Sequence, residues 1–213
     1  MKKIFAIGDI HGCIIKLQAL VSMLPFDAEQ DTLLFVGDYI DRGPDSKGVI
    51  DYLIALKKEI RSVVFLSGNH ERMFLNYYRH NKGKELFLIN GGESTIISYG
   101  HAGLKDGRKM NVPESHLEFF TSLRTFYETE DYIFVHAGLK PGIPWEKQDP
   151  DDMLSIRREF VESAEDFGKT VVFGHSSLDE PLVEPNKIGI DTGAVYGGKL
   201  TCVELPALKI YQV

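Results

Sequence analysis

Three times in its first part, the chain repeats one pattern: an apolar run, a glycine-containing polar loop and then a helical stretch. The apolar runs lie at residues 3–7, 32–36 and 63–66, and the loops that follow them read GDIHG, GDYIDRGPDS and GNHE. Short apolar runs bounded by such loops and followed by helical periodicity are typical of buried strands in an α/β sheet. Open α/β sheets bind ligands at the carboxyl ends of their strands. We therefore expect these three loops to form a functional site.

The remainder of the chain changes character twice. Residues from about 72 to 122 are helical and rich in loops, and they predict a helical cap region. From residue 125 onward the pattern is that of strands, in the segments TFYETE, DYIFVH, TVVFGH, IGIDTG and GGKLTCVEL. We expect these strands to form a second, mostly antiparallel sheet packed on the first. No linker divides the chain, which predicts a single domain over residues 1–213.

Composition excludes several classes of protein. With 213 residues, 43% of them hydrophobic, the chain can bury a core without disulfides. Its net charge is −7 and its basic residues are dispersed, which argues against a partner of duplex nucleic acid. No apolar stretch approaches the roughly 20 residues of a membrane span, and the two cysteines, Cys13 and Cys202, are far apart. We expect a cytoplasmic protein without membrane partners; its oligomeric state stays open.

Five short motifs place an oxygen or nitrogen ligand directly after a hydrophobic run. The candidate ligands are Asp9, His11, Asp38, Asn69, His136 and His175. Carboxylate, amide and imidazole donors suit Mn²⁺, Fe or Zn²⁺, and six donors suffice for two divalent ions bridged by Asp38; Mn²⁺ is the ion that we predict. Two ions about 3.5–4 Å apart would activate a bridging water for direct attack on phosphorus. A phosphoenzyme is then unnecessary.

In this order, GDIHG, GDYIDRG, GNHE, HAG and GH resemble the phosphoprotein phosphatase family of calcineurin-like metallophosphoesterases, of the bacterial serine/threonine protein phosphatase type. The resemblance spans residues 8 to 198. It implies an α/β fold in which a two-sheet β-sandwich is flanked by helices. It also implies that His70 is the general acid, oriented by Asp41. Further, it implies that Arg42, Arg157 and Asn69 contact the phosphate.

The chain departs from related sequences at two positions. Related nucleases and phosphodiesterases end in GHxH, whereas this chain reads GHSS with Ser177 in place of the second histidine. This difference favours the phosphoprotein phosphatase branch. Ser155 stands where similar family members commonly have tryptophan. That second departure leaves open whether Arg157 or Arg158 contacts the phosphate.

The pentapeptide HAGLK occurs twice, so a motif search does not identify the ligand. His136 follows the apolar run DYIFV, whereas His101 follows a polar turn and precedes a charged loop. We therefore assign the metal ligand to His136 and expect His101 in a solvated loop. His80 and His116 lie in polar helical surroundings and are expected at the surface. The glycines of NGGEST predict a tight turn, with close backbone approach to the site as the alternative.

These features predict a metal-dependent phosphomonoesterase, acting on phosphoserine, phosphothreonine or phosphotyrosine in proteins or on a small phosphorylated substrate. The alternative within the same family is a symmetrical dinucleoside tetraphosphatase, which the short chain disfavours because it leaves little room for nucleotide-binding insertions. A remote alternative is a non-catalytic phosphate-binding module. The presence of both the acid and every metal ligand argues against such a module.

Overall fold

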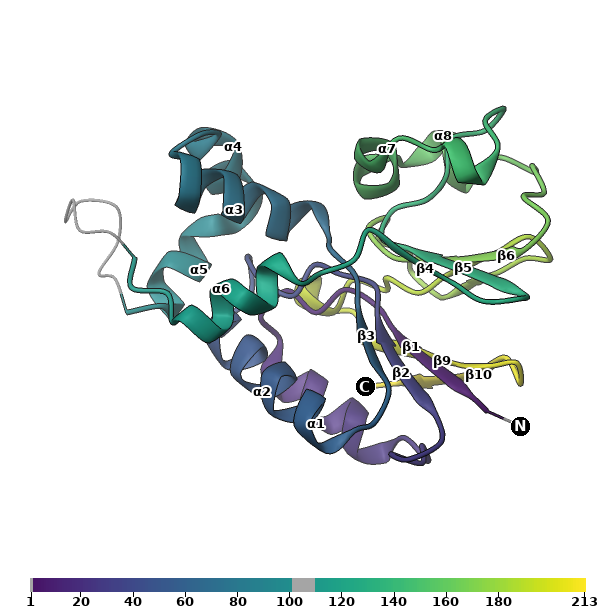
Figure 1. Cartoon of the computed structure of the whole chain (residues 1–213), viewed down its shortest axis with the longest axis horizontal. Helices are drawn as coiled ribbons and strands as arrows, with labels where there is room; N and C mark the ends of the chain where they lie inside the picture. The colour runs from purple at the N-terminus through teal and green to yellow at the C-terminus, as the bar shows by residue number, and fades with distance from the viewer. Residues whose placement is uncertain (1, 101–109) are drawn as a thin grey trace.

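Two five-stranded sheets form the centre of the molecule in a computed structural model, which describes residues 2–100 and 110–213 (Figure 1). The repeated HAGLK segment that begins at His101 lies outside the described residues. In the first sheet the strand order is β10-β9-β1-β2-β3. Its strands are β1 (Ile4–Ile7), β2 (Thr32–Phe35), β3 (Val63–Phe65), β9 (Thr201–Leu205) and β10 (Lys209–Gln212). The three apolar runs of the repeated pattern are its parallel strands.

The second sheet has the order β4-β5-β6-β8-β7. Its strands are β4 (Phe126–Glu128), β5 (Tyr132–Val135), β6 (Thr170–Phe173), β7 (Leu182–Val183) and β8 (Lys187–Gly189). The central strands β5, β6 and β8 are parallel, and only the edge strands β4 and β7 run antiparallel. The prediction of a mostly antiparallel sheet was therefore wrong. A helical crossover joins β5 to β6, and such a connection returns the chain in the same direction.

The last predicted strand also belongs elsewhere. GGKLTCVEL contains β9, which pairs antiparallel with β1 of the first sheet, for example Cys202 opposite Ile7. The expected run of five strands in one sheet is thus divided between the two sheets. Strand alternation in the sequence reports burial but not the neighbouring strand, since pairing depends on contacts far apart in the chain.

Helices cover both outer faces of the sandwich, and the cap region lies to one side. The helices are α1 (Ile14–Met23), α2 (Ser46–Glu59), α3 (Asn69–His80), α4 (Lys84–Phe87), the π-helix η1 (Leu88–Gly92), α5 (Glu93–Ser98), α6 (Glu114–Thr121), α7 (Pro150–Ser155) and α8 (Arg158–Val161), with short 3₁₀ turns η3 (Trp145–Lys147) and η4 (Ala194–Tyr196). Figure 1 shows α1 and α2 beside the first sheet, α7 and α8 beside the second, and α3 to α6 gathered on the left. Within the described residues no helix is both long enough and apolar enough to cross a bilayer.

Alternating side chains along the strands produce separate hydrophobic layers. Phe5 and Ile7 pack with the helices on the outer face of the first sheet, whereas Ala6 points to the opposite face. There it shares a core with Phe134 and Val172 of the second sheet. Opposite-face packing is expected from the two-residue period of a strand. The predicted α/β fold class, a two-sheet β-sandwich flanked by helices, is confirmed.

His116 is buried, which contradicts its predicted place at the surface. Its side chain lies between α2 and α5 and is only 2% exposed. Its Nε2 donates to Asp51 Oδ1 (2.9 Å), and its Nδ1 accepts the hydroxyl of Tyr99 (2.8 Å). Both ring nitrogens are therefore satisfied away from water. His80, at the end of α3, is exposed as predicted.

The core between the two sheets should contribute strongly to stability. Replacing the fully buried Phe134 with alanine should lower the free energy of unfolding by about 3–5 kcal/mol, because it removes a large side chain and leaves a cavity. Urea unfolding followed by circular dichroism measures this change. Phe126→Ala is the matched control, since its side chain is 39% exposed; an equal loss in both variants would contradict the shared core.

Candidate metal centre and active site

The loops after five strands bring the predicted ligands together. Asp9 and His11 follow β1, Asp38 follows β2, Asn69 follows β3, His136 follows β5 and His175 follows β6. Two groups of potential ligands result, His11 with Asp38 and His70, and Asp38 with His136 and His175. The ligand atoms within each group lie within 4.8 Å of one another. Asp38 belongs to both groups, as a bridging ligand must.

The Asp38 carboxylate is the geometric centre of the site. Its Oδ2 lies 3.5 Å from His11 Nε2, and its Oδ1 lies 3.4 Å from His136 Nε2. His136 Nε2 in turn lies 3.1 Å from Asn69 Oδ1 and 3.2 Å from His175 Nδ1. Oxygen and nitrogen atoms that follow strands of both sheets are thus clustered near Asp38 Oδ1.

Backbone carbonyls fix the tautomers of two of these histidines. His11 Nδ1 donates to the carbonyl oxygen of Ile40 (2.7 Å), and His136 Nδ1 donates to that of Val36 (3.0 Å). In the neutral imidazole the other nitrogen, Nε2, then carries a lone pair. A metal-binding histidine is commonly oriented in this way by its second nitrogen. Both Nε2 atoms face Asp38.

Burial and neighbouring charges shift the pKa values of the candidate ligands. Burial lowers the pKa of His11 to about 3, and burial together with His136 lowers the pKa of His175 to about 3. Both rings are therefore neutral near pH 7 and available as ligands. Burial also lowers the pKa of His136, but the Asp38 charge outweighs it and raises that pKa to about 9. Burial and Asp191 raise the pKa of Asp9, because negative charge is crowded here.

The donor set suits divalent metal ions. Its members are carboxylate, amide and imidazole groups, which match Mn²⁺, Fe or Zn²⁺ rather than a thiolate-selected metal. His11, Asp38, Asn69, His136 and His175 present their ligand atoms to the shared space. Asp9 lies beside them but outside both groups; its carboxylate accepts the backbone N–H of His175 at 3.0 and 3.2 Å.

His70 and Asp41 form a buried acid pair. His70 Nδ1 lies 2.6 Å from Asp41 Oδ2, and His70 Nε2 lies 3.9 Å from Asp38 Oδ2. Burial lowers the pKa of His70, but the charges of Asp38 and Asp41 and the hydrogen bond to Asp41 raise it above its usual value overall. A protonated imidazole beside the metal ligands can donate a proton to a leaving oxygen.

The three candidate arginines occupy different surroundings. Arg42 Nη1 donates to His11 Nε2 (2.6 Å), which places the guanidinium at the metal ligands. Arg157 Nη1 donates to the carbonyl oxygen of His175 (3.1 Å). Arg158 instead pairs with Glu162 (2.7 Å), and its side chain is 85% exposed. Of the two adjacent arginines, Arg157 is therefore the one at the site.

The site has an unusual concentration of left-handed backbone. Seven non-glycine residues among those described have positive φ, and five of them are His11, Asp38, Asp41, Arg42 and His175. Such conformations cost on the order of 1–3 kcal/mol each and persist where the surroundings hold them, commonly at functional sites. The fold thus holds the ligand loops in conformations that an isolated peptide would avoid.

Glu71 supplies part of that restraint, and motif analysis missed its role. This fully buried carboxylate accepts the backbone N–H groups of Gly68 (2.9 Å), Asp38 (3.0 Å) and Tyr39 (2.8 Å). It therefore clamps the loops after β2 and β3 to each other. Gly68 is required there, since a Cβ would lie 2.0 Å from Asp38 Oδ1. The position of Glu71 within GNHE was the available signal.

Comparison with known families agrees with this geometry. The family described as calcineurin-like phosphoesterase matches residues 2–204, nearly the whole chain. The chain belongs to this family. It is accordingly a hydrolase of the metallophosphoesterase class, and the enzyme prediction is confirmed at that level.

Several relatives of this chain have names that refer to a nucleotide substrate. Bis(5'-nucleosyl)-tetraphosphatase PrpE [asymmetrical] of Oceanobacillus iheyensis is 28% identical over 99% of this chain and 92% of its own length. The protein of the same name from Anoxybacillus flavithermus is 29% identical, over 97% and 92%. A solved putative diadenosine tetraphosphatase has a TM-score of 0.76 and 25% identity, covering 100% of this chain and 93% of its own.

A solved protein-tyrosine phosphatase shares the fold more distantly. The cold-active enzyme of a psychrophilic Shewanella has a TM-score of 0.61 and 18% identity, covering 100% of this chain and 80% of its own. At this identity the likeness supports the fold alone.

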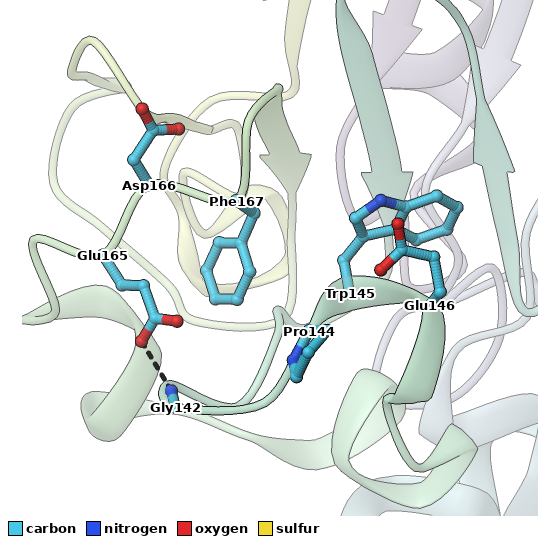
Figure 2. A pocket seen from close by; sticks show the side chains of 7 residues that line it. All are labelled: Gly142, Pro144, Trp145, Glu146, Glu165, Asp166 and Phe167. Carbon is cyan, nitrogen blue, oxygen red and sulfur yellow. Dashed lines mark hydrogen bonds between the residues drawn. The ribbon is translucent and has the colours of Figure 1, made fainter.

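A cavity of about 370 Å³ has no candidate metal ligand among its lining residues (Figure 2). Trp145 and Phe167 line it together with the carboxylates of Glu146, Glu165 and Asp166, and Glu165 accepts the backbone N–H of Gly142. Its three acidic side chains would repel a phosphate group. The cavity is therefore unsuited to a phosphorylated substrate.

The bridging position of Asp38 can be tested by counting metal ions. Asp38→Asn should lower the occupancy of both sites, because one carboxylate serves both ligand groups. Elemental analysis after equilibration with Mn²⁺ and removal of free metal measures the occupancy. Asp31→Asn is the control: Asp31 is also buried, but it bonds only to the backbone of Lys3 and Asp27 among the described residues. Wild-type metal content in Asp38→Asn would contradict the bridge.

Proposed function

We propose that the chain is a two-metal hydrolase whose preferred substrates are dinucleoside tetraphosphates. The shared Asp38 carboxylate, with imidazoles converging on both of its oxygens, is the observation that carries the catalytic part of this proposal. The substrate class is supported by the names of relatives that align with nearly the whole chain. Both parts concern the same site.

The length of the chain no longer disfavours a nucleotide substrate. We expected a short chain to leave little room for nucleotide-binding insertions. The relatives named as tetraphosphatases are themselves covered over 92% of their length. This chain therefore aligns with nearly all of each relative, so those relatives contain no large nucleotide-binding segment that is missing here. Chain length is thus no longer a reason to prefer a protein substrate.

The residues of the chain divide the work of hydrolysis. Arg42 contacts the His11 ring and Arg157 contacts the backbone carbonyl of His175, and from these positions their guanidinium groups can hold phosphate oxygens. His70, oriented by Asp41, donates a proton to the leaving oxygen. Two divalent ions, Mn²⁺ in our proposal, would polarise the phosphate and activate water. Asn69 and the other candidate ligands would hold these ions.

Hydrolysis of phosphomonoesters, including phosphoserine, phosphothreonine or phosphotyrosine of proteins, is the second candidate. Its support is the sequence resemblance to phosphoprotein phosphatases, carried by GDYIDRG, GNHE and the GHSS ending. The metal ligands and the acid pair would serve either reaction, because both require attack on phosphorus and departure of an oxygen leaving group. A non-catalytic phosphate-binding role is disfavoured because the acid pair is intact.

A substrate panel separates these candidates. With Mn²⁺, we expect kcat/KM for diadenosine tetraphosphate to exceed that for phosphoserine and phosphotyrosine peptides by at least about tenfold, a difference of about 1.4 kcal/mol in transition-state stabilisation. Chromatography of the nucleotide products shows whether cleavage is symmetrical or, as the relatives' names state, asymmetrical. Chelation of the metal should abolish turnover. Faster hydrolysis of the phosphopeptides would favour the second candidate, and full activity without metal would refute both.

The role of His70 can be tested through the leaving group. His70→Asn should retain its metal ions but lose about 10²–10⁴-fold in kcat for phenyl phosphate, whose leaving group needs a proton. It should lose much less for 2,4-dinitrophenyl phosphate, because that leaving group departs as an anion. His80→Asn, on the exposed end of α3, is the control. Equal losses on the two esters would show that His70 serves another step.

A further inference from the structure

The cap helix α5 reaches the acid pair through one side chain. Thr95 is completely buried, and its Oγ1 lies 2.6 Å from Asp41 Oδ1 and 2.9 Å from the backbone nitrogen of Asp41. The other carboxylate oxygen of Asp41 faces His70 Nδ1 at 2.6 Å. Thr95, Asp41 and His70 therefore form one hydrogen-bonded chain from the cap to the metal ligands.

The direction of each hydrogen bond follows from counting protons. The Thr95 hydroxyl has a single proton, and the Asp41 carboxylate accepts it. The backbone N–H of Asp41 then donates to Thr95 Oγ1, and so does the hydroxyl of Ser46, which lies 2.9 Å away. One donated and two accepted bonds use the full capacity of the hydroxyl. The Thr95 proton consequently has one direction, toward Asp41 Oδ1.

We propose that Thr95 is the positioning residue of the general acid. By holding Oδ1, it fixes the rotation of the Asp41 carboxylate and keeps Oδ2 aimed at His70 Nδ1. Asp41 has φ of +71°, so its backbone alone does not favour this position. This inference rests on the proposed function, because it takes His70 as the group that protonates the leaving oxygen.

The segment before Thr95 contacts the neighbouring arginine in the same manner. The carbonyl oxygen of Gly91 accepts the backbone N–H of Arg42 at 3.1 Å. Gly91 has φ of +94°, and a Cβ there would lie 2.7 Å from Arg42 Cγ. Gly91 is the non-helical residue at which η1 is kinked. The glycines of NGGEST thus allow the cap backbone to approach the site closely, which was the alternative to a simple tight turn. Thr95 follows about one helical turn later in the chain.

The experiment compares three changes on α5. Thr95→Val removes the hydroxyl at nearly constant volume, Thr95→Ser retains it, and Ser98→Ala is the control. Ser98 Oγ bonds Asp45 Oδ1 (3.1 Å) and the backbone N–H of Lys47 (2.8 Å), so it ties the same helix to α2 without contacting Asp41. Each variant is assayed with Mn²⁺ on phenyl phosphate and on 2,4-dinitrophenyl phosphate, with metal content measured in parallel.

Thr95→Val should lose about 10–100-fold in kcat on phenyl phosphate, the range typical for removing a partner that orients a catalytic side chain. On 2,4-dinitrophenyl phosphate it should lose no more than a few fold, with KM and metal content unchanged. Thr95→Ser should restore turnover to within a few fold, and Ser98→Ala should show no difference between the esters. If Thr95→Val does not fold, Thr95→Cys, whose thiol is a weak donor, should show an intermediate difference.

Three results would overturn the inference: equal losses on both esters, loss of metal from Thr95→Val, or the same pattern in Ser98→Ala. His70→Asn, assayed in parallel, separates the two levels of the hypothesis. If His70→Asn shows the leaving-group difference and Thr95→Val does not, only the role of Thr95 is wrong. If His70→Asn shows no difference, the acid assignment of the proposed function fails first.

Discussion

The buried charge of Asp38 is the interaction on which the site depends. One carboxylate, only 1% exposed, faces imidazoles from His11, His70 and His136. A buried anion is stable only when cations or donors surround it. Strands from both sheets supply those partners, so the sandwich must be assembled before the site exists. The candidate site therefore depends on packing between the two sheets as well as on the ligand residues.

The contacts that restrain the loop backbone also fix the position of the candidate ligands. Asp38 occupies a left-handed conformation, and Glu71 accepts backbone N–H groups from the loops that follow the neighbouring strands β2 and β3. The carboxylate of Glu71 contacts no candidate ligand atom in these bonds; it acts on the peptide groups. A buried glutamate thus stabilises loops whose conformation would otherwise be costly.

The active site has two supports that come from different parts of the chain. The metal ligands are carried by loops after the strands, whereas the acid pair contacts α5 through Thr95. Separate supports let the cap vary while the metal centre stays constant. A difference in the cap would then alter proton donation and substrate fit rather than metal binding. Function on a shared fold depends on the site rather than on the fold itself, and the two supports act on different parts of this site.

The sequence by itself determined the fold class, the candidate ligands and the strands that carry them, because these depend on local periodicity and on short motifs such as GDIHG and GNHE. The same local signals misplaced β9 and the direction of the central strands of the second sheet, since strand partners are chosen by contacts distant in sequence. They also placed His116 at the surface, although Tyr99 and Asp51 satisfy it in the interior. Only the tertiary structure selected Arg157 over Arg158 as the arginine at the site and brought Thr95 to Asp41, 54 residues away in the chain. Hydrogen bonds of such long range leave no periodic trace in a sequence, because they depend on where the packed helices carry each side chain.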